Sequence, residues 1–232
     1  IWQDADVVYE EFEWGDSAPW KDYYEEVNSV YVNATCVELK QDGYENYIVF
    51  RDFPNLKEIR FGDAFHSEQL GSMDSMFANC EKLEYVDLSK FNTSNVTTMS
   101  GMFADCKALT SLDVSSFDTS KVQSFSGMFA RCENLNNLDV SGFDTSKGTD
   151  FSYIFSGCSS LTSIDVSGFD TSNAIYLSGF FDGCQGLTEL DVTNFVTANA
   201  VVMNNMFSKC SGLREIDLSN FDTSNVATMA SM

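Results

Sequence analysis

Two hydrophobic periods alternate along the chain, and together they fill a unit of 26 residues. Residues 112–115 alternate apolar and polar side chains, which predicts a short strand with one buried face. The apolar positions from Val122 to Cys132 recur at steps of three, three, one and three residues, which predicts one face of a short helix. Thr119 and Ser120 stand just before that segment, where hydroxyls cap free N–H groups. Each unit therefore predicts a strand, a turn, a short helix and a second turn.

The same residue types return at the same place in successive units. The most regular position is a cysteine, at Cys80, Cys106, Cys132, Cys158, Cys184 and Cys210. A phenylalanine lies three residues before each of these cysteines and a leucine lies three residues after it. A unit of this size leaves its own apolar face uncovered, but stacked units cover one another. The sequence therefore predicts a tandem-repeat solenoid.

Stacking also predicts the fold class. Strands of successive units align into a parallel sheet on one face, and the helices form the opposite wall. Connections between parallel strands are almost always right-handed. We therefore expect an α/β repeat protein, a right-handed solenoid of the leucine-rich-repeat type with a parallel sheet on one face and short helices on the other.

The repeat weakens toward the N-terminus. Residues 80–232 hold the regular units, and residues 27–79 hold divergent coils in which Phe53 takes the place of the cysteine. Residues 1–26 carry all three tryptophans among acidic residues, which suits a cap on the end of the core. Because the pattern stops at Met232 without a capping sequence, we expect more repeats or other domains to follow.

Composition limits the classes of molecule that the chain is expected to bind. The chain has 35 acidic and 13 basic residues and a formal net charge of −22. Such a chain repels nucleic-acid phosphates and anionic lipid surfaces. No apolar run approaches the roughly 18–20 residues that a membrane span needs. We therefore expect neither nucleic-acid binding nor direct membrane insertion, and expect partners that are proteins or glycans.

The outward face of the predicted strands is the candidate binding surface. It repeats one aspartate per unit, at Asp87, Asp113, Asp139, Asp165, Asp191 and Asp217. A second outward position varies between units, and there Tyr85, Glu189 and Glu215 differ most from the Ser111, Asn137 and Ser163 of other units. Stacked carboxylates repel one another. Either flanking Ser and Thr hydroxyls offset that repulsion, or the column binds calcium or a basic or hydroxyl-rich partner.

Motifs for catalysis and for zinc are absent from the sequence. No CxxC pair occurs, and the regular cysteines are predicted to pack as reduced thiols in the core. His66 is the only histidine, and neither G-x-S-x-G nor H-E-x-x-H occurs. We therefore predict no catalytic residues and a chain that is not an enzyme.

The unit resembles a known family. Stretches such as LTSLDVSSFDTSKVQSFSGMFARC and LREIDLSNFDTSNVATMASM are similar to the BspA-like leucine-rich repeat surface proteins. The resemblance covers residues 53–232, with single departures such as Val196, Ala198 and Gly148. It implies a secreted or cell-wall-attached protein that adheres to host or neighbouring-cell molecules. A passive stalk that projects another domain is the alternative.

Overall fold

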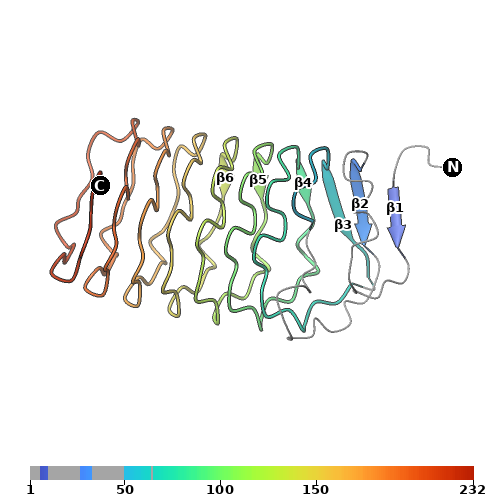
Figure 1. Ribbon diagram of the computed structural model, residues 1–232, viewed down its shortest axis with the longest axis horizontal. Coiled ribbons are helices and arrows are strands. Elements are labelled where there is room, and N and C mark those ends of the chain that lie inside the picture. The colour runs from blue at the N-terminus through green and yellow to red at the C-terminus, as the bar shows by residue number, and fades with distance from the viewer. Residues whose placement is uncertain (1–5, 10–26, 33–49, 64) are drawn as a thin grey trace.

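A computed structural model describes residues 6–9, 27–32, 50–63 and 65–232. Its coils stack in one row along the long axis, with the first described strand at one end and the C-terminus at the other (Figure 1). Each coil contributes one extended segment to each of two opposite sides of the core. The described part of the chain is therefore a repeat solenoid, as the period of the sequence predicts.

One side of the row, here called the sheet wall, consists of parallel strands. β1 (Asp6–Tyr9), β2 (Ser29–Val32), β3 (Glu58–Phe61) and β4 (Tyr85–Val86) form a four-stranded sheet in chain order, and β5 (Ser111–Leu112) pairs with β6 (Asn137–Leu138). In register, Ile59 lies opposite Val30 and Val86, so the apolar residues share the inner face. The predicted parallel sheet is confirmed.

The opposite side, here called the turn wall, is a second parallel ladder. Single bridges join Ser72, Thr98, Ser124, Asp150, Tyr176, Val202 and Thr228 in turn. Alternate N–H groups reach the next coil, as from Met99 to Ser124 O at 3.0 Å and from Phe103 to Met128 O at 2.8 Å. The N–H groups between them close short turns within their own coil. Every second residue therefore ties one coil to the next.

The prediction of short helices is wrong, since residues 65–232 contain turns where helices were expected. Gly127 and Arg131, within the expected helix, have φ values of +61° and +58°, which interrupt a right-handed helix. An α-helix is about 10 Å wide, whereas coils joined by backbone hydrogen bonds stand about 4.8 Å apart. Stacked helices would therefore break the ladder, and consecutive turns place the same apolar residues inward without doing so. The handedness of the winding stays a prediction.

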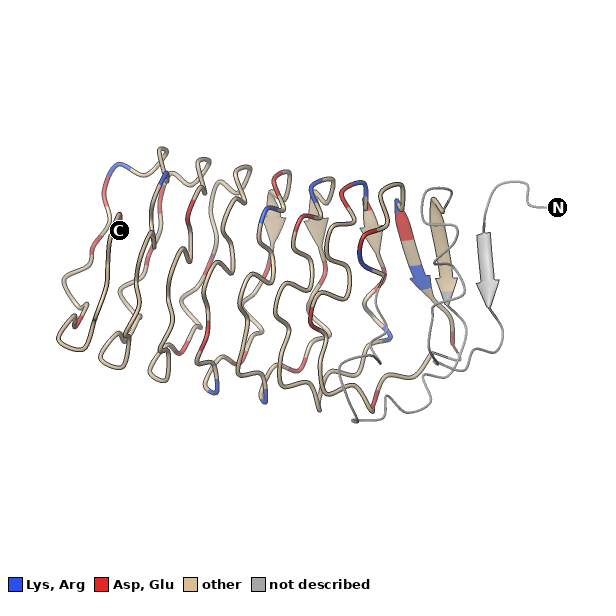
Figure 2. Ribbon diagram, viewed as in Figure 1, with Lys and Arg blue, Asp and Glu red and all other residues tan. Residues whose placement is uncertain are grey.

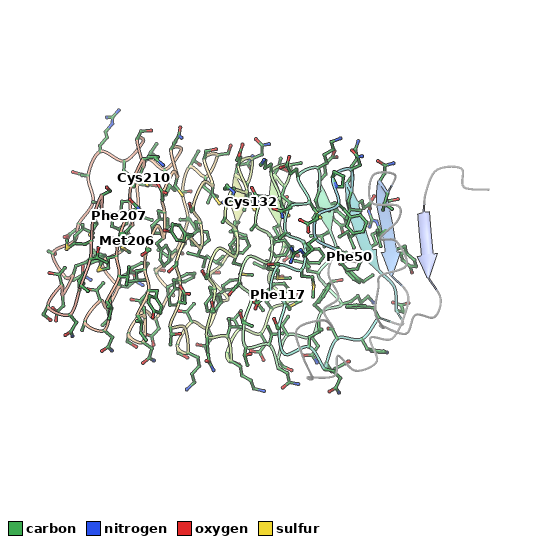
Figure 3. All side chains as sticks on the ribbon, in the orientation of Figure 1. Phe50, Phe117, Cys132, Met206, Phe207 and Cys210 are labelled. Carbon is green, nitrogen blue, oxygen red and sulfur yellow. The ribbon has the colours of Figure 1, made fainter. Side chains whose placement is uncertain are left out.

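The core between the two walls is a set of stacked side chains (Figure 3). Phe103 lies parallel to Phe129 with ring centroids 5.9 Å apart, and Phe155 continues the stack at 5.7 Å. All three rings are fully buried. Offset stacking adds to the free energy gained from burial itself. The repeat of phenylalanine in the sequence is thus the repeat of ring contacts in the core.

The regular cysteines are free thiols in this core. Each donates a hydrogen bond to a carbonyl of the preceding coil, as Cys132 Sγ does to Phe103 O at 3.1 Å. Burial raises the pKa of Cys80 and of Cys132 to about 12. The prediction of packed thiols is confirmed for the five buried residues from Cys80 to Cys184, Cys210 is only partly buried, and Cys36 lies outside the described residues.

The repeated threonines have a different role from the one predicted. Thr93, Thr119 and Thr145 are buried, and no helix follows them to be capped. Thr93 Oγ1 donates to Asp118 O at 2.9 Å and accepts from Asp118 N at 2.7 Å. Because one hydroxyl satisfies both polar groups of a residue in the next coil, the column is a third connection between coils. The serine that follows each threonine binds an aspartate or asparagine in the turn instead, as Ser120 does with Asp118.

The predicted cap falls largely outside the described residues, and so do its three tryptophans. β1 lies within residues 1–26 and pairs with β2 in parallel register, Val7 opposite Val30. The cap region therefore contributes a strand to the sheet wall. How it closes the core stays a prediction.

Candidate functional site

All the residues predicted as a binding surface lie on the outer face of the sheet wall, here called the sheet face. The register of β3 and β4 places Glu58 beside Tyr85, and Arg60 and Asp87 follow two residues later on each strand. The aspartates are exposed, except that Asp87 is half-buried. Two outward columns therefore run along the solenoid, as the strand pattern predicts.

Neighbouring hydroxyl and amide groups satisfy the aspartate column. Thr193 donates to Asp191 Oδ1 through its amide at 2.9 Å and its hydroxyl at 2.6 Å, and Ser115 does the same for Asp113. These hydrogen bonds lower the pKa of both carboxyls. The pKa of Asp165 is lowered in the same way by Ser167, although Asp139 and Asp191 on either side oppose the shift. The hydroxyl partners that the sequence suggested are therefore present, and their effect on the pKa of these carboxyls outweighs the repulsion between neighbouring aspartates.

The N-terminal part of the sheet face carries cations and aromatic rings. The Arg60 guanidinium lies 4.7 Å from the centre of the Tyr85 ring and also contacts Glu58. Lys90 Nζ lies 2.7 Å from Asp63 Oδ1. Figure 2 shows basic residues beside acidic ones on these coils. Arg60 and Lys90 therefore each lie against a carboxylate.

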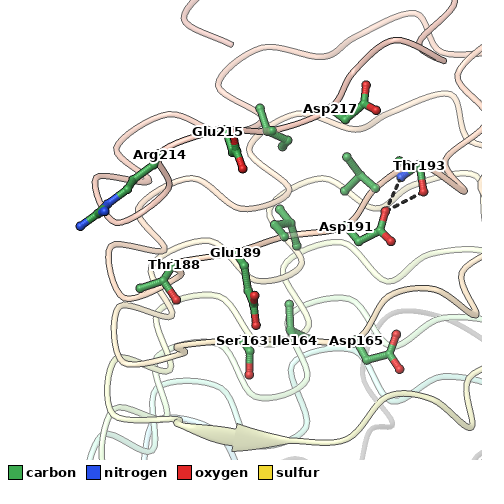
Figure 4. A pocket seen from close by; sticks show the side chains of 13 residues that line it. Ser163, Ile164, Asp165, Thr188, Glu189, Asp191, Thr193, Arg214, Glu215 and Asp217 are labelled. Carbon is green, nitrogen blue, oxygen red and sulfur yellow. Dashed lines mark hydrogen bonds between the residues drawn. The ribbon is translucent and has the colours of Figure 1, made fainter.

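The C-terminal part is different, because the face is hollowed. The hollow has a volume of about 1050 Å³ and is lined by residues 163–165, 188–193 and 214–217. Glu189 and Glu215 lie one above the other beside the column of Asp165, Asp191 and Asp217 (Figure 4). Arg214 points away from these carboxylates (Figure 4). We call this surface the acidic hollow.

The strands of the coils around the hollow do not pair with one another. Near β4, Tyr85 N donates to Lys57 O and Asp87 N to Ile59 O, each at 3.0 Å. No backbone hydrogen bond joins residues 163–166, 189–192 and 215–218 to one another, all of which the structure describes. Like charges on neighbouring coils oppose close approach. The inner residues Ile164, Leu190 and Ile216 are accordingly only partly buried.

Two glycines give a sequence signal for the hollow that the pattern analysis missed. A Cβ at Gly186 would lie 2.7 Å from Leu161 O, and one at Gly212 would lie 2.4 Å from Leu187 O. Earlier units carry Lys82, Ala108 or Asn134 at this position. Glycines that allow close contact with the preceding coil thus mark two of the three coils that line the hollow.

Within the described ranges, no group of three or more His, Cys, Asp and Glu residues is arranged to hold a metal ion. His66 Nδ1 lies 3.6 Å from Glu68 Oε1, and both side chains are about half exposed (54% and 53%). In the same part of the chain, no helix has the length and apolarity of a membrane span.

Comparisons with known proteins identify a family and one similar structure. A family described as "Mycoplasma protein of unknown function, DUF285" matches residues 49–164 and 149–232. No curated protein matches the chain. A leucine-rich repeat protein of T. pallidum is similar in structure over 81% of the chain, with 18% identity and a TM-score of 0.42. The chain spans 65% of the length of that protein.

Proposed function

The chain belongs to the family described as Mycoplasma protein of unknown function, DUF285, and we propose that it is a binding module that holds a partner protein on its sheet face. The BspA-like resemblance of its repeats supports a location at the cell surface and a role in adhesion. The acidic hollow is the observation that carries the proposal, since it is where the regular face of the solenoid becomes concave and leaves its strand backbone unpaired.

The chemistry of the hollow selects a basic partner. Five carboxylates, at Asp165, Glu189, Asp191, Glu215 and Asp217, line it, and Arg214 turns away from them. Lysine and arginine side chains of a partner complement such a surface and speed its approach. The unpaired strand backbone and the partly buried Ile164, Leu190 and Ile216 add hydrogen-bonding groups and apolar area. A protein segment offers all three complements together.

A second candidate function is a passive stalk. The observation that favours it is the turn wall, whose bridges run without a break from Ser72 to Thr228. A continuous ladder makes a stiff spacer, and a spacer needs no ligand. The extended concave surfaces of repeat proteins also bind partners, so a stiff stack of coils is compatible with either role.

Binding of the purified chain to a panel of matrix proteins, whole cells and glycans separates the two functions. We expect binding to one or more basic proteins, weakened by salt because exposed charges are screened. The variant Glu189→Ser with Glu215→Ser should reduce it at least about tenfold, since interfacial charge pairs at this count are worth several kcal/mol. Serine stands at this position in Ser111 and Ser163, so the fold tolerates it.

The matched control removes two carboxylates away from the hollow. Glu84→Thr with Glu133→Gln lowers the net negative charge by the same amount and should leave binding nearly unchanged. Equal losses of binding affinity in both variants would mean that net charge alone governs binding. Binding to glycans only would mean that the partner is a glycan and not a protein. No binding across the panel would favour the stalk.

A further inference from the structure

A groove crosses three consecutive coils at the edge of the turn wall. It has a volume of about 620 Å³, and each coil lines it with two outward residues: Lys147 and Thr149, Asn173 and Ile175, Asn199 and Val201. Ile175 N donates to Thr149 O and Val201 N donates to Ile175 O, each at 2.9 Å, so the second residues of the pairs stand in one ladder. The groove therefore has two rows of side chains, and each coil adds one side chain to each row.

The first row carries amide oxygens that are held in place. Asn173 Nδ2 donates to Ser146 O at 2.9 Å, and Asn199 Nδ2 donates to Ser172 O at 2.7 Å. Neither Oδ1 receives a hydrogen bond from a described residue. Because each amide is tied to the preceding coil through its nitrogen, its oxygen is a fixed, free acceptor. These acceptors follow the step of the coils, which is about 4.8 Å.

Earlier coils close the same acceptor with a lysine. Lys121 Nζ donates to Asn95 Oδ1 of the preceding coil at 2.8 Å. Asn199 stands at the place of that lysine relative to Asn173, so the Asn173 acceptor stays open. Lys147, in the coil before Asn173, forms no hydrogen bond or ion pair with any described residue. The groove thus offers one free donor beside two free acceptors.

The second row is apolar where other coils are polar. Ile175 and Val201 are 36% and 37% exposed. Their places in earlier coils are held by Thr97, Gln123 and Thr149, which form the same ladder. Packing therefore does not require the two aliphatic side chains. Apolar side chains gathered on a surface commonly mark a site of interaction.

The chemistry of the two rows favours a sugar. A pyranose ring has hydroxyl groups around its edge and C–H groups on its faces, which suit fixed polar groups beside an apolar strip. The lining has no carboxylate to attract a basic partner, and the net charge of −22 repels acidic ones. An extended peptide repeats its same-side N–H groups every ~6.6 Å, out of step with acceptors ~4.8 Å apart. A pyranose ring with its glycosidic oxygen is close in length to one coil step.

We infer that this groove binds a neutral glycan chain, which lies along the solenoid with one sugar ring at each coil. Hydroxyl groups of successive rings donate to Asn173 Oδ1 and Asn199 Oδ1, and Lys147 Nζ donates to a hydroxyl of the ring before them. The C–H faces of the rings pack on Ile175 and Val201. The groove and the acidic hollow lie on different walls, so this inference does not depend on the proposed function.

NMR titration of the purified chain with neutral oligosaccharides of increasing length tests the inference. The probes are cello-, chito-, xylo- and manno-oligosaccharides, from the monosaccharide to the tetrasaccharide. We expect at least one series to bind, with an affinity that rises up to the trisaccharide, because each added ring reaches another coil. The affinity should be insensitive to salt, since the ligand carries no charge to be screened.

Two variants test the two rows of the groove. Asn199→Lys should lower the affinity at least about tenfold, because a lysine there reaches Asn173 Oδ1 as Lys121 reaches its own partner. Ile175→Thr with Val201→Thr should also lower the affinity, because the C–H faces lose their apolar contact. Both variants use residues that other coils have at these places, and an unchanged melting temperature shows that the fold is retained.

The controls place the same kinds of change on the sheet face. Asn137→Lys, and Glu189→Ser with Glu215→Ser, should leave the affinity for the oligosaccharide unchanged. No binding by any series, or binding that does not depend on length, would overturn the inference. Glycan binding lost in the Glu189 and Glu215 variant would place the sugar in the acidic hollow instead. A bound protein that is released by Asn199→Lys would make the groove a protein site, which also contradicts the inference.

Discussion

The two walls of the solenoid use the same 26-residue period but differ in how far their ladders extend. Strand pairing on the sheet wall is interrupted between β4 and β5 and ends at β6, and the coils that follow leave their strand backbones unpaired around the acidic hollow. The turn wall keeps its bridges to Thr228. The coils around the hollow are therefore held by the turn wall, the stacked rings and the threonine column. One wall can then vary its surface because the other holds the stack.

The largest expected effect comes from comparing the cores behind the two walls. Phe155 is fully buried and stacks against Phe129 and Phe181. Phe155→Ala should lower the free energy of unfolding by about 3–5 kcal/mol, because it opens a cavity in this stack. Ile164→Ala, behind the open sheet wall, should cost less than half as much since Ile164 is only partly buried. Urea unfolding of both variants measures this. Equal losses would mean that the two walls contribute alike.

The next effect tests the threonine column that links the coils. Thr145 Oγ1 donates to Asp170 O at 3.1 Å and accepts from Asp170 N at 2.7 Å. Thr145→Val keeps the shape but leaves both groups unpaired in a buried position, which should cost about 1–3 kcal/mol. The exposed Thr162→Val is the control and should change the unfolding free energy by less than about 0.5 kcal/mol. A neutral Thr145→Val would remove this column from the account.

A smaller effect probes the backbone of the turn wall. Gly127 has a φ of +61°, and a Cβ there would lie 3.7 Å from Ala130 Cβ, an ordinary contact. Gly127→Ala should therefore cost about 1–2 kcal/mol through the left-handed backbone alone. Gly142 has a negative φ and open space around its Cα, so Gly142→Ala should be neutral or slightly stabilising. Thermal unfolding of the pair checks this, and an equal response would contradict the turn geometry.

The smallest effect concerns a single titration on the sheet wall. The hydroxyl and amide of Thr193 lower the pKa of Asp191, so their stabilisation is present above the ordinary aspartate pKa of about 3.9 and is lost as pH falls through the lower folded value. Thr193→Val removes the hydroxyl and should move the pKa of Asp191 upward. Carbon NMR of the carboxyl during an acid titration measures it. An unmoved pKa would show that the hydroxyl contributes nothing.

Sequence pattern predicts most of the fold because the repeat is a packing repeat. Strand positions such as Ile59 and Val86, and the buried thiol of Cys132, follow directly from the period. The helix prediction is wrong because steps of three, three, one and three place Val122 to Cys132 inward in consecutive turns as well as in a helix. Gly127, in the middle of that segment, indicates a turn and not a helix, because its backbone is left-handed.

The candidate site is less accessible to sequence reasoning. The columns of Asp191 and Glu189 follow from strand alternation, but the hollow depends on the distance between coils, which no single unit encodes. The threonine column looked like helix capping because Thr119 precedes an apolar run. Its burial appears only when Asp144 of the next coil is placed against it.

Hydrogen–deuterium exchange of single amides tests the central claim, that the turn wall holds the coils around an open sheet wall. The amide of Phe181, bonded to Met206 O at 2.9 Å, should exchange slowly, as should that of Asp87 in the paired sheet. The amides of Asp165 and Asp191 should exchange far faster, because the structure gives them no backbone acceptor. Protection of Asp165 and Asp191 equal to that of Phe181 would contradict the account, since the sheet wall would then be closed.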